Sequence, residues 1–306
     1  MKSFFRIMGG IILIASLLFS GCGFPESVPV EPVSELSTSP SDPAQLPDEP
    51  NETTFTIATW NIGHFSKGGK YYPTAFTESN YARKLREFQS YINSLGADIL
   101  SLNEYSNELM RDEADTAVKK ELLSDYPIVL EGDQRYYSCN ALYSKVALEN
   151  VAVKEYECNQ GKWKNVQINP NNGTVKATQY YYIEADLNVD GKQVKVVCTH
   201  LAFQGIDKDP LIKDQVDELI EKFSSYDRVI MMGDWNSEDF PFFKDCFEKG
   251  GFRLANENAD TVTYPSDLWV LSLDNFVYKG VTVRNFQVKQ TDLSDHYAVV
   301  CRMSVD

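Results

Sequence analysis

The stretch TDLSDHYAVVCRM, residues 291–303, places a titratable pair directly against a core strand. The apolar run that starts at Tyr297 predicts a buried strand, because β-branched and aromatic residues favour that conformation. Asp295 and His296 stand immediately before the run, and the chain contains only three histidines. A buried strand does not need an acid and an imidazole at its start. The pair therefore indicates a functional site at one edge of a sheet.

The other predicted core strands share this feature, since each apolar run ends or begins with a polar residue that an isolated strand would not need. The runs are TFTIATWNI (54–62), ADILSLNEY (97–105), the second arm of TQYYYIEADLNVDGKQVKVVCTHL (178–201), RVIMMGDWN (228–236) and SLDNFVYKGV (272–281). The polar residues at the strand ends are Asn61, Asn103, Glu104, Thr199, His200, Asp234, Asn236 and Asp274. We expect their side chains to gather at one sheet edge.

Helical patterns alternate with these strands. Three segments carry apolar residues at helical spacing, namely residues 81–95, 209–226 and 240–249. Asn80 is suited to cap the first segment, and Gly250 to end the third. These signals predict helices that cover the sheet strands.

Two further local signals complete the outline of the domain. Asp190 and Gly191 suit a tight turn between two β-rich runs, which predicts a hairpin. CNALYSKVAL (139–148) predicts one more strand. Ser237 is expected to cap the helix predicted over residues 240–249. Strands and helices mix without an internal repeat. The sequence therefore predicts one α/β domain over residues 53–306, with much antiparallel pairing.

Charge restricts the classes of partner. The chain carries a formal net charge of −15, and residues 53–306 hold 37 acidic and 27 basic residues. An acidic domain does not attract polyanions by bulk charge. This weighs against nucleic acid as a partner, although a small, locally positive or metal-filled site leaves nucleic acid open.

The N-terminal segment is predicted to direct export. Lys2 and Arg6 precede the apolar run IMGGIILIASLLFSG (7–21), which is short for a membrane span and is followed by Cys22. The ending LFSGC resembles a bacterial lipobox, with Phe19 in place of the usual aliphatic residue. Residues 1–22 are thus read as a signal peptide whose cleavage leaves Cys22 lipidated. A plain signal peptide and a retained anchor are the alternatives.

Residues 23–52 are predicted to be a disordered, acidic, proline-rich tether. They hold seven of the thirteen prolines of the chain, seven acids and no base. Such a segment cannot bury enough apolar surface to offset the entropy lost on ordering. The expected location is the cell envelope, with the domain exported and anchored to the membrane by the lipid on Cys22. We expect the domain to be a monomer.

The remaining cysteines show no spacing typical of zinc ligands. Cys198 and Cys301 lie in apolar strand-like runs and Cys246 lies in a helical pattern, so all three are expected to be buried hydrophobic residues. Cys139 and Cys158 flank a predicted hairpin. In an oxidising compartment these two could pair, and the sequence leaves that alternative open.

The predicted edge has the composition of a hard-cation site that acts on phosphorus. Carboxylates and carboxamides together suit Mg²⁺, or Mn²⁺ in its place. Two histidines beside them can move protons or hold a phosphate oxygen. This set supports attack of activated water on a phosphorus centre.

The motifs TWNI, DILSLNE, CTHL, GDWN, LDNFVY and SDH, in this order, resemble the endonuclease/exonuclease/phosphatase superfamily over about residues 55–302. That superfamily includes DNase I, exonuclease III-type AP endonucleases, neutral sphingomyelinases and inositol polyphosphate 5-phosphatases. The resemblance implies a DNase I-like four-layer α/β sandwich. In that fold two mixed, largely antiparallel sheets pack face to face and the helices lie outside.

The resemblance also implies a role for each matched residue. Glu104 matches the principal metal ligand, Asn61 matches an asparagine that supports the metal and phosphate, and Asp295 matches an aspartate close to the metal. Five residues are implied to act in catalysis. His200 matches a histidine near the leaving group, and Asp234 with Asn236 match residues that position or activate water. Asp274 matches the aspartate that orients the terminal histidine, and His296 matches that histidine, which acts on the phosphate.

Two positions depart from the pattern of the superfamily. Asn103 replaces the usual glutamine before the metal glutamate, which puts contacts of the longer amide in doubt. Gly63 stands where several AP endonucleases carry an acid, and with His200 it weakens the AP-endonuclease interpretation.

Each polar residue also has a structural explanation by itself. Asn61 could form a turn, Glu104 could face solvent, and Asp234 with Asn236 could cap a helix. His64, in a loop rich in Gly, Lys and Tyr, is better explained as an exposed loop residue than as a substrate contact. The ordered set of six motifs favours catalysis over these separate explanations.

The predicted function is hydrolysis of phosphodiester bonds by a metal-dependent phosphoesterase, and a nuclease is the favoured interpretation. The alternatives are a phospholipase C or sphingomyelinase-like enzyme, and a phosphatase of inositol phosphates or sugar phosphates. A binding protein without catalysis on the same fold is a third class, which predicts a degraded site. All the matched polar positions are filled, and this disfavours that class.

Overall fold

The computed structural model describes residues 53–65, 81–105, 121–131, 140–159, 165–168, 175–178, 180–202, 211–265 and 270–305. The signal segment, the tether and the predicted cap Asn80 lie outside these residues. Among the helices described, none is long and apolar enough to cross a membrane.

The first sheet has six strands in the order β15-β16-β1-β2-β4-β3. Only β1 and β2 run parallel, and the other neighbours are antiparallel. The strands are β1 (Thr54–Asn61), β2 (Ile99–Asn103), β3 (Ile128–Glu131), β4 (Ala141–Ser144), β15 (Thr282–Lys289) and β16 (Ala298–Ser304).

The second sheet has six strands in the order β11-β14-β10-β9-β8-β5. Here only β9 and β10 run parallel. The strands are β5 (Leu148–Glu155), β8 (Tyr181–Val189), β9 (Lys192–His200), β10 (Val229–Asp234), β11 (Arg253–Leu254) and β14 (Asp274–Lys279). Both sheets are therefore mixed and largely antiparallel.

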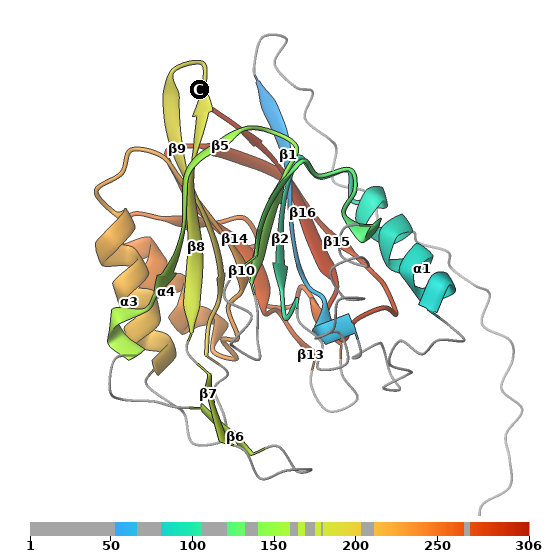
Figure 1. Cartoon of the computed structure of the whole chain (residues 1–306). Coiled ribbons are helices and arrows are strands. Elements are labelled where there is room, and N and C mark those ends of the chain that lie inside the picture. The colour runs from blue at the N-terminus through green and yellow to red at the C-terminus, as the bar shows by residue number, and fades with distance from the viewer. Residues whose placement is uncertain are drawn as a thin grey trace, which may run out of the picture. The chain divides into compact units, whose positions relative to one another are not determined.

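Helices cover the outer faces of the two sheets. Figure 1 shows α1 (Tyr81–Ser94) outside the first sheet, and α3 (Leu211–Phe223) with α4 (Phe240–Lys249) outside the second. Two short two-stranded sheets complete the described strands, one of β6 (Asn165–Ile168) with β7 (Val175–Thr178) and one of β12 (Tyr264–Pro265) with β13 (Val270–Leu271). Two 3₁₀ turns are also described, η1 (Gly63–Phe65) and η3 (Glu157–Asn159).

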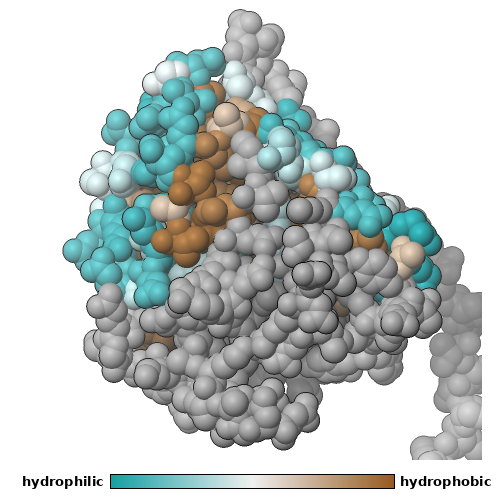
Figure 2. Space-filling model, in the orientation of Figure 1, coloured by the Kyte–Doolittle hydropathy of each residue, from teal (hydrophilic) through white to brown (hydrophobic). Residues whose placement is uncertain are grey.

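Three separate apolar cores fill the spaces between these layers. Phe88 of α1 packs with Trp60 on the first sheet, and a second core lies between the sheets. Along β10 the side chains alternate, so that Met232 enters the core between the sheets while Met231 packs under α3 and α4. Figure 2 shows apolar residues between two hydrophilic flanks on one face of the molecule. These layers confirm the expected four-layer α/β sandwich.

Both ends of the described domain lie at the same edge of the first sheet. Thr54 at the start of β1 pairs with Ser304 at the end of β16. Asn61, at the other end of β1, lies about 23 Å away at 3.3 Å per residue. The chain therefore enters and leaves at the edge opposite Asn61.

Most local predictions agree with the structure. The apolar residues Leu85, Phe88 and Ile92 of α1 are buried, and Gly250 caps the end of α4 as expected. Asp190 and Gly191 form the β8–β9 turn with φ of 52° and 83°, the left-handed region that such turns require.

Two local predictions were wrong. CNALYSKVAL does not form one strand, because β4 ends at Ser144 in the first sheet and β5 begins at Leu148 in the second. Ser237 does not cap α4. Asp239 does, since its side chain accepts a hydrogen bond from the backbone N–H of Phe242, while the Ser237 hydroxyl donates to the carbonyl of Asp239.

The cysteines are free thiols where the structure describes them. Cys198 and Cys301 are buried as expected, and Cys246 is partly buried. Cys158 is also a free thiol, and Cys139 lies outside the described residues. Their pairing therefore stays untested.

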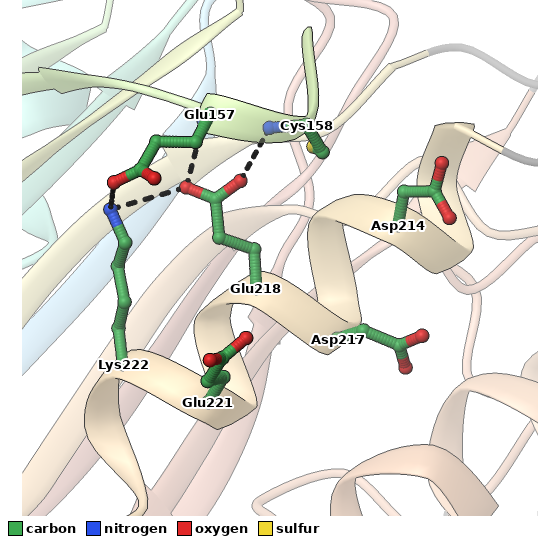
Figure 3. Close-up of a pocket in the computed structure, with 7 residues that line it drawn as sticks. All are labelled: Glu157, Cys158, Asp214, Asp217, Glu218, Glu221 and Lys222. Carbon is green, nitrogen blue, oxygen red and sulfur yellow. Dashed lines mark hydrogen bonds and ion pairs between the residues drawn. The ribbon is translucent and has the colours of Figure 1, made fainter.

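A buried carboxylate joins η3 to α3 (Figure 3). Glu218 is 9% exposed and accepts hydrogen bonds from the backbone N–H groups of Glu157 and Cys158, at 3.0 and 2.9 Å. Lys222, one turn further along α3, lies 3.3 Å from Glu218 and 3.0 Å from Glu157. Burial alone would raise the pKa of Glu218, but these hydrogen bonds lower it below its usual value.

Candidate active site

The two parallel strand pairs bring the predicted residues to one edge. Asn61 pairs with Asn103 at the end of β1 and β2, and His200 pairs with Asp234 at the end of β9 and β10. Asp274, the first residue of antiparallel β14, also pairs with Asp234. Because parallel strands end at the same edge, each pair delivers two polar side chains there.

A close backbone approach fixes the position of Asp234. The preceding residue, Gly233, has φ of 155°, and a Cβ atom there would lie 1.8 Å from the carbonyl oxygen of Thr199. Only glycine fits this space. The glycine of the GDWN motif therefore lets β10 lie close enough to β9 for Asp234 to reach the edge.

Side-chain amides connect the two sheets at this edge. The Asn61 amide nitrogen donates to Oδ2 of Asp234 at 2.9 Å. Oδ1 of Asn103 accepts from the backbone N–H of Asp234 at 3.0 Å, and its amide nitrogen donates to the carbonyl of Thr199 at 2.9 Å. The shorter amide at position 103 thus bridges from β2 to both β9 and β10. It also donates to Asn140, which sequence reasoning did not identify.

His296 and Asp274 form a buried pair across the two sheets. Nδ1 of His296 lies 2.9 Å from Oδ2 of Asp274, and the two residues are 5% and 0% exposed. Burial alone would lower the pKa of His296. The neighbouring carboxylates, Asp274 first and then Asp234 and Asp295, raise it instead to about 10. The ring is therefore an imidazolium at neutral pH.

Asp274, rather than the adjacent Asp295, holds the His296 ring. Burial raises the pKa of Asp274, and the positive charge on His296 opposes that rise. The ring nitrogen bonds across the sandwich to Asp274, the residue that the resemblance implied would orient it, and not to its sequence neighbour.

The carboxylate of Asp234 lies between two imidazoles. Its Oδ2 is 3.5 Å from Nε2 of His200 and 3.7 Å from Nε2 of His296. Its other oxygen, Oδ1, accepts from the backbone N–H of Asn236 at 2.9 Å. This oxygen is held by the backbone, while Oδ2 faces the two rings.

His200 is oriented by Asn236. The Asn236 amide nitrogen lies 2.8 Å from Nε2 of His200 and also donates to the carbonyl of Leu201 at 3.0 Å. Because the amide donates, Nε2 of His200 accepts, and a neutral ring then carries its proton on Nδ1. Asn236 itself has φ of 50°, an uncommon value that the hydrogen bonds around it maintain.

The predicted metal residues are joined through the backbone of β1. The N–H of Ile62 donates to the carbonyl of Asn103 at 2.9 Å, so Glu104 follows directly beside β1. The Ser294 hydroxyl donates to the carbonyl of Asn61 at 2.7 Å, which brings Asp295 to the same place. Glu104 has φ of 50° and is partly exposed, as is Asp295.

Sequence reasoning missed several supporting residues. The Trp60 indole donates to the carbonyl of His296 at 3.1 Å, and the N–H of His296 donates to the Ser294 hydroxyl at 3.2 Å. The Thr263 hydroxyl accepts the backbone N–H of Asp274, and the Tyr264 ring contacts the His296 ring. Ser294 belongs to the SDH motif and could have been recognised there, whereas Thr263 lies in a segment without a motif. His64 lies in η1.

Two mixed sheets packed face to face, with acids, amides and two histidines at one edge, are typical of phosphoester hydrolases of the DNase I-like class. The model of the Endonuclease/Exonuclease/phosphatase family matches residues 58–296, and the chain belongs to this family. It is therefore a metal-dependent hydrolase that acts on phosphoester bonds. No curated protein matches the sequence significantly.

Solved structures share the fold at low sequence identity. An endonuclease/exonuclease/phosphatase protein from Beutenbergia cavernae aligns with a TM-score of 0.60 at 15% identity, covering 82% of this chain and 72% of that one. D. rerio TDP2 complexed with single-strand DNA product aligns at 0.58 and 15%, covering 82% and 99%. The human Nocturnin catalytic domain with bound sulfate aligns at 0.58 and 16%, covering 83% and 98%.

The donors at this edge fit the divalent cation that the family uses. Carboxylate and amide oxygens are the ligands that hard cations prefer. Ligand atoms of Asp234, Asp274 and His296 lie within 4.8 Å of one another. Oδ1 of Asp274 is buried without a hydrogen-bond partner among the described residues. One acidic oxygen of the site, Oδ1 of Asp274, therefore has no hydrogen-bond donor among the described residues and suits a cation.

Proposed function

We propose that the protein is an exported, membrane-tethered phosphodiesterase that requires Mg²⁺ and acts as a nuclease. The observation that carries this proposal is the Asp234 carboxylate between Nε2 of His200 and Nε2 of His296. A carboxylate between two imidazoles can accept a proton from water, while a neighbouring imidazole can donate a proton to the departing oxygen.

His296 is assigned to the phosphate. Asp274 holds its Nδ1, so Nε2 is the nitrogen available to substrate. The raised pKa keeps the ring positively charged at neutral pH. Such a ring stabilises the negative charge that develops on phosphoryl oxygens during attack.

Asp234 and His200 are assigned to proton transfer. Asn61 and the Asn236 N–H hold the Asp234 carboxylate, which orients it toward an attacking water. His200 accepts from Asn236 at Nε2, which fixes its ring close to Asp234. We assign His200 to the leaving oxygen.

Asn61, Glu104 and Asp295 are assigned to the metal. His296 is left out of this set because it is assigned to the phosphate. When bound, the cation supplies positive charge to the non-bridging phosphate oxygens. Mn²⁺ is expected to replace Mg²⁺ because both prefer oxygen ligands.

A polynucleotide is the substrate that the observations favour. His200 stands where DNase I-like members of the superfamily place a histidine near the leaving group. D. rerio TDP2, which shares the fold, was solved with a single-strand DNA product. The acidic balance of the domain disfavours nucleic acid only mildly, because a strand can be held by few phosphate contacts.

Export and anchoring are proposed from the sequence of the first 52 residues. Lys2 and Arg6, the apolar run and Cys22 support cleavage and lipidation, and the proline-rich segment supports a tether. A monomeric domain at the cell envelope would then meet substrate outside the cytoplasm. Metabolic labelling with a fatty acid, compared between the native chain and Cys22→Ala, tests the anchor.

Nicking of supercoiled plasmid by the purified protein tests the nuclease. We expect nicking with Mg²⁺ or Mn²⁺, none with EDTA, and none from a folded His296→Ala variant. Parallel reactions contain phospholipid vesicles and sugar phosphates. Hydrolysis confined to those substrates would contradict the nuclease proposal and favour the phospholipase C-like or phosphatase alternatives.

A further inference from the structure

Thr263 occupies an unusual position beside the strand that carries Asp274. It is fully buried, and its N–H donates to the carbonyl of Leu271 at 2.9 Å. Its hydroxyl oxygen accepts two backbone hydrogen bonds, from Leu273 at 2.9 Å and from Asp274 at 3.0 Å. One side chain therefore holds the backbone of β14 at the point where it delivers the carboxylate.

The carbonyl of the same residue reaches the other sheet. It accepts the N–H of Tyr297 at 2.7 Å, directly after His296. Thr263 thus bonds to the chain at both members of the pair, at Asp274 in the second sheet and beside His296 in the first. Such a bridge fixes the separation of the two backbones.

Tyr264 then contacts the imidazole itself. Its ring centroid lies 4.8 Å from that of His296, with the planes tilted by 54°. Tyr264 is partly buried and is held by pairing with Leu271 between β12 and β13. Aromatic rings favour such tilted contacts over a flat face-to-face stack.

We propose that Thr263 and Tyr264 are positioning residues that hold His296 and Asp274 in register across the two sheets. This inference rests on the proposed function, in which the pair acts on the phosphate. Neither residue needs to touch substrate. Thr263 sets the backbone separation through its hydroxyl and carbonyl, and Tyr264 sets the plane of the ring.

A purely structural role would give a different result. Removing an acceptor from two buried N–H groups lowers stability in any case. A positioning role adds a loss in kcat, because a small displacement of a reacting group has a large effect on rate. Substrate affinity and metal affinity should change little, since neither residue is assigned to them.

The test compares Thr263→Val, which keeps the shape and removes the hydroxyl, with Thr263→Ser, which keeps the hydroxyl. Hydrolysis of bis(p-nitrophenyl) phosphate is measured with the purified protein and Mn²⁺. We expect kcat to fall about 10- to 100-fold in Thr263→Val with KM nearly unchanged, and Thr263→Ser to retain most of it. Tyr264→Leu and Tyr264→Phe form a second pair, in which Phe is expected to keep activity.

A spectroscopic measurement tests the positioning role independently of enzyme activity. The Nδ1 proton of His296, in its hydrogen bond to Asp274, should give a downfield NMR signal in the native protein and in Thr263→Ser. We expect the signal to shift or disappear in folded Thr263→Val, or in Tyr264→Leu if the valine variant does not fold. An unchanged signal together with unchanged kcat would overturn the inference.

His296→Ala in the same hydrolysis assay separates the two possible failures. If it keeps full activity, the proposed function of the site is wrong. If it is inactive while folded Thr263→Val matches the native protein in both kcat and NMR signal, only the positioning role is wrong.

Discussion

Asp274 and His296 reach each other from different sheets, with 2.9 Å between Oδ2 and Nδ1. Asp274 opens β14 of the second sheet, and His296 precedes β16 of the first. The pair therefore forms only when the two sheets are packed in their native register. Its geometry reports directly on the assembly of the sandwich.

Asp274→Asn is expected to lower kcat about 10²- to 10⁴-fold, the range associated with loss of acid–base function. The amide keeps the size of the side chain but removes the negative charge that holds His296 as an imidazolium. Plasmid nicking under saturating substrate measures the loss. Asp292→Asn, on an exposed neighbour, is the matched control and should behave as the native protein.

Glu104→Gln is expected to weaken binding of the divalent cation. Replacing a carboxylate by a neutral amide removes charge from the site while keeping its size, so the dissociation constant for Mn²⁺ in calorimetry should rise about 10-fold or more. Glu121→Gln, an exposed acid, provides the control. Equal affinities in the two variants would assign the metal to other residues.

Gly233→Ala is expected to destabilise the protein by more than about 4 kcal/mol, or to prevent folding. The added methyl group would lie 1.8 Å from the backbone carbonyl of Thr199, which cannot move without separating β9 from β10. Gly191→Ala also has a positive φ but meets nothing within 4 Å. It should cost only about 1–2 kcal/mol in urea unfolding.

Glu218→Gln is expected to lower the free energy of unfolding at neutral pH and to matter less in acid. Hydrogen bonds from Glu157 and Cys158 hold the pKa of Glu218 below its usual value in the folded state. A depressed pKa contributes stability above the unfolded-state value, and this contribution is lost as pH falls through the folded-state value.

The measurement is urea unfolding of the native protein and Glu218→Gln at pH 7 and again in acid below pH 4. The difference in unfolding free energy between the two should shrink in acid. Glu221→Gln, on the neighbouring exposed acid of α3, is the control, and a constant difference for Glu218→Gln would refute the role of its charge (Figure 3).

The residues at the strand ends could be predicted because their signal is local. A polar residue at the end or start of an apolar run stands out, as Asn61 and Asp234 do at the end and Asp274 does at the start. Their convergence follows from strand pairing, since parallel neighbours end at one edge. The order of the motifs also indicated the four-layer fold.

The remaining features depend on contacts between distant parts of the chain. The β-rich run around Lys145 gives no sign that β4 and β5 belong to different sheets, because both halves have the same propensity. Thr263 acts through backbone groups at residues 273, 274 and 297, which no periodicity reveals. In the sequence, Asn103 differs from the usual glutamine only by its shorter side chain. The assembled sheets show that this amide bonds to the backbones of Thr199 and Asp234.

The pairing of Thr54 with Ser304 gives the domain a site for attaching labels or supports away from its reactive edge. Both ends of the described domain lie at the edge opposite Asn61, about 23 Å along β1. A biotin, a fluorophore or a bead attached at either end would therefore leave the reactive edge uncovered. The domain can be immobilised on a surface by attachment beside Thr54 or beside Ser304 and still present its histidines to a long substrate.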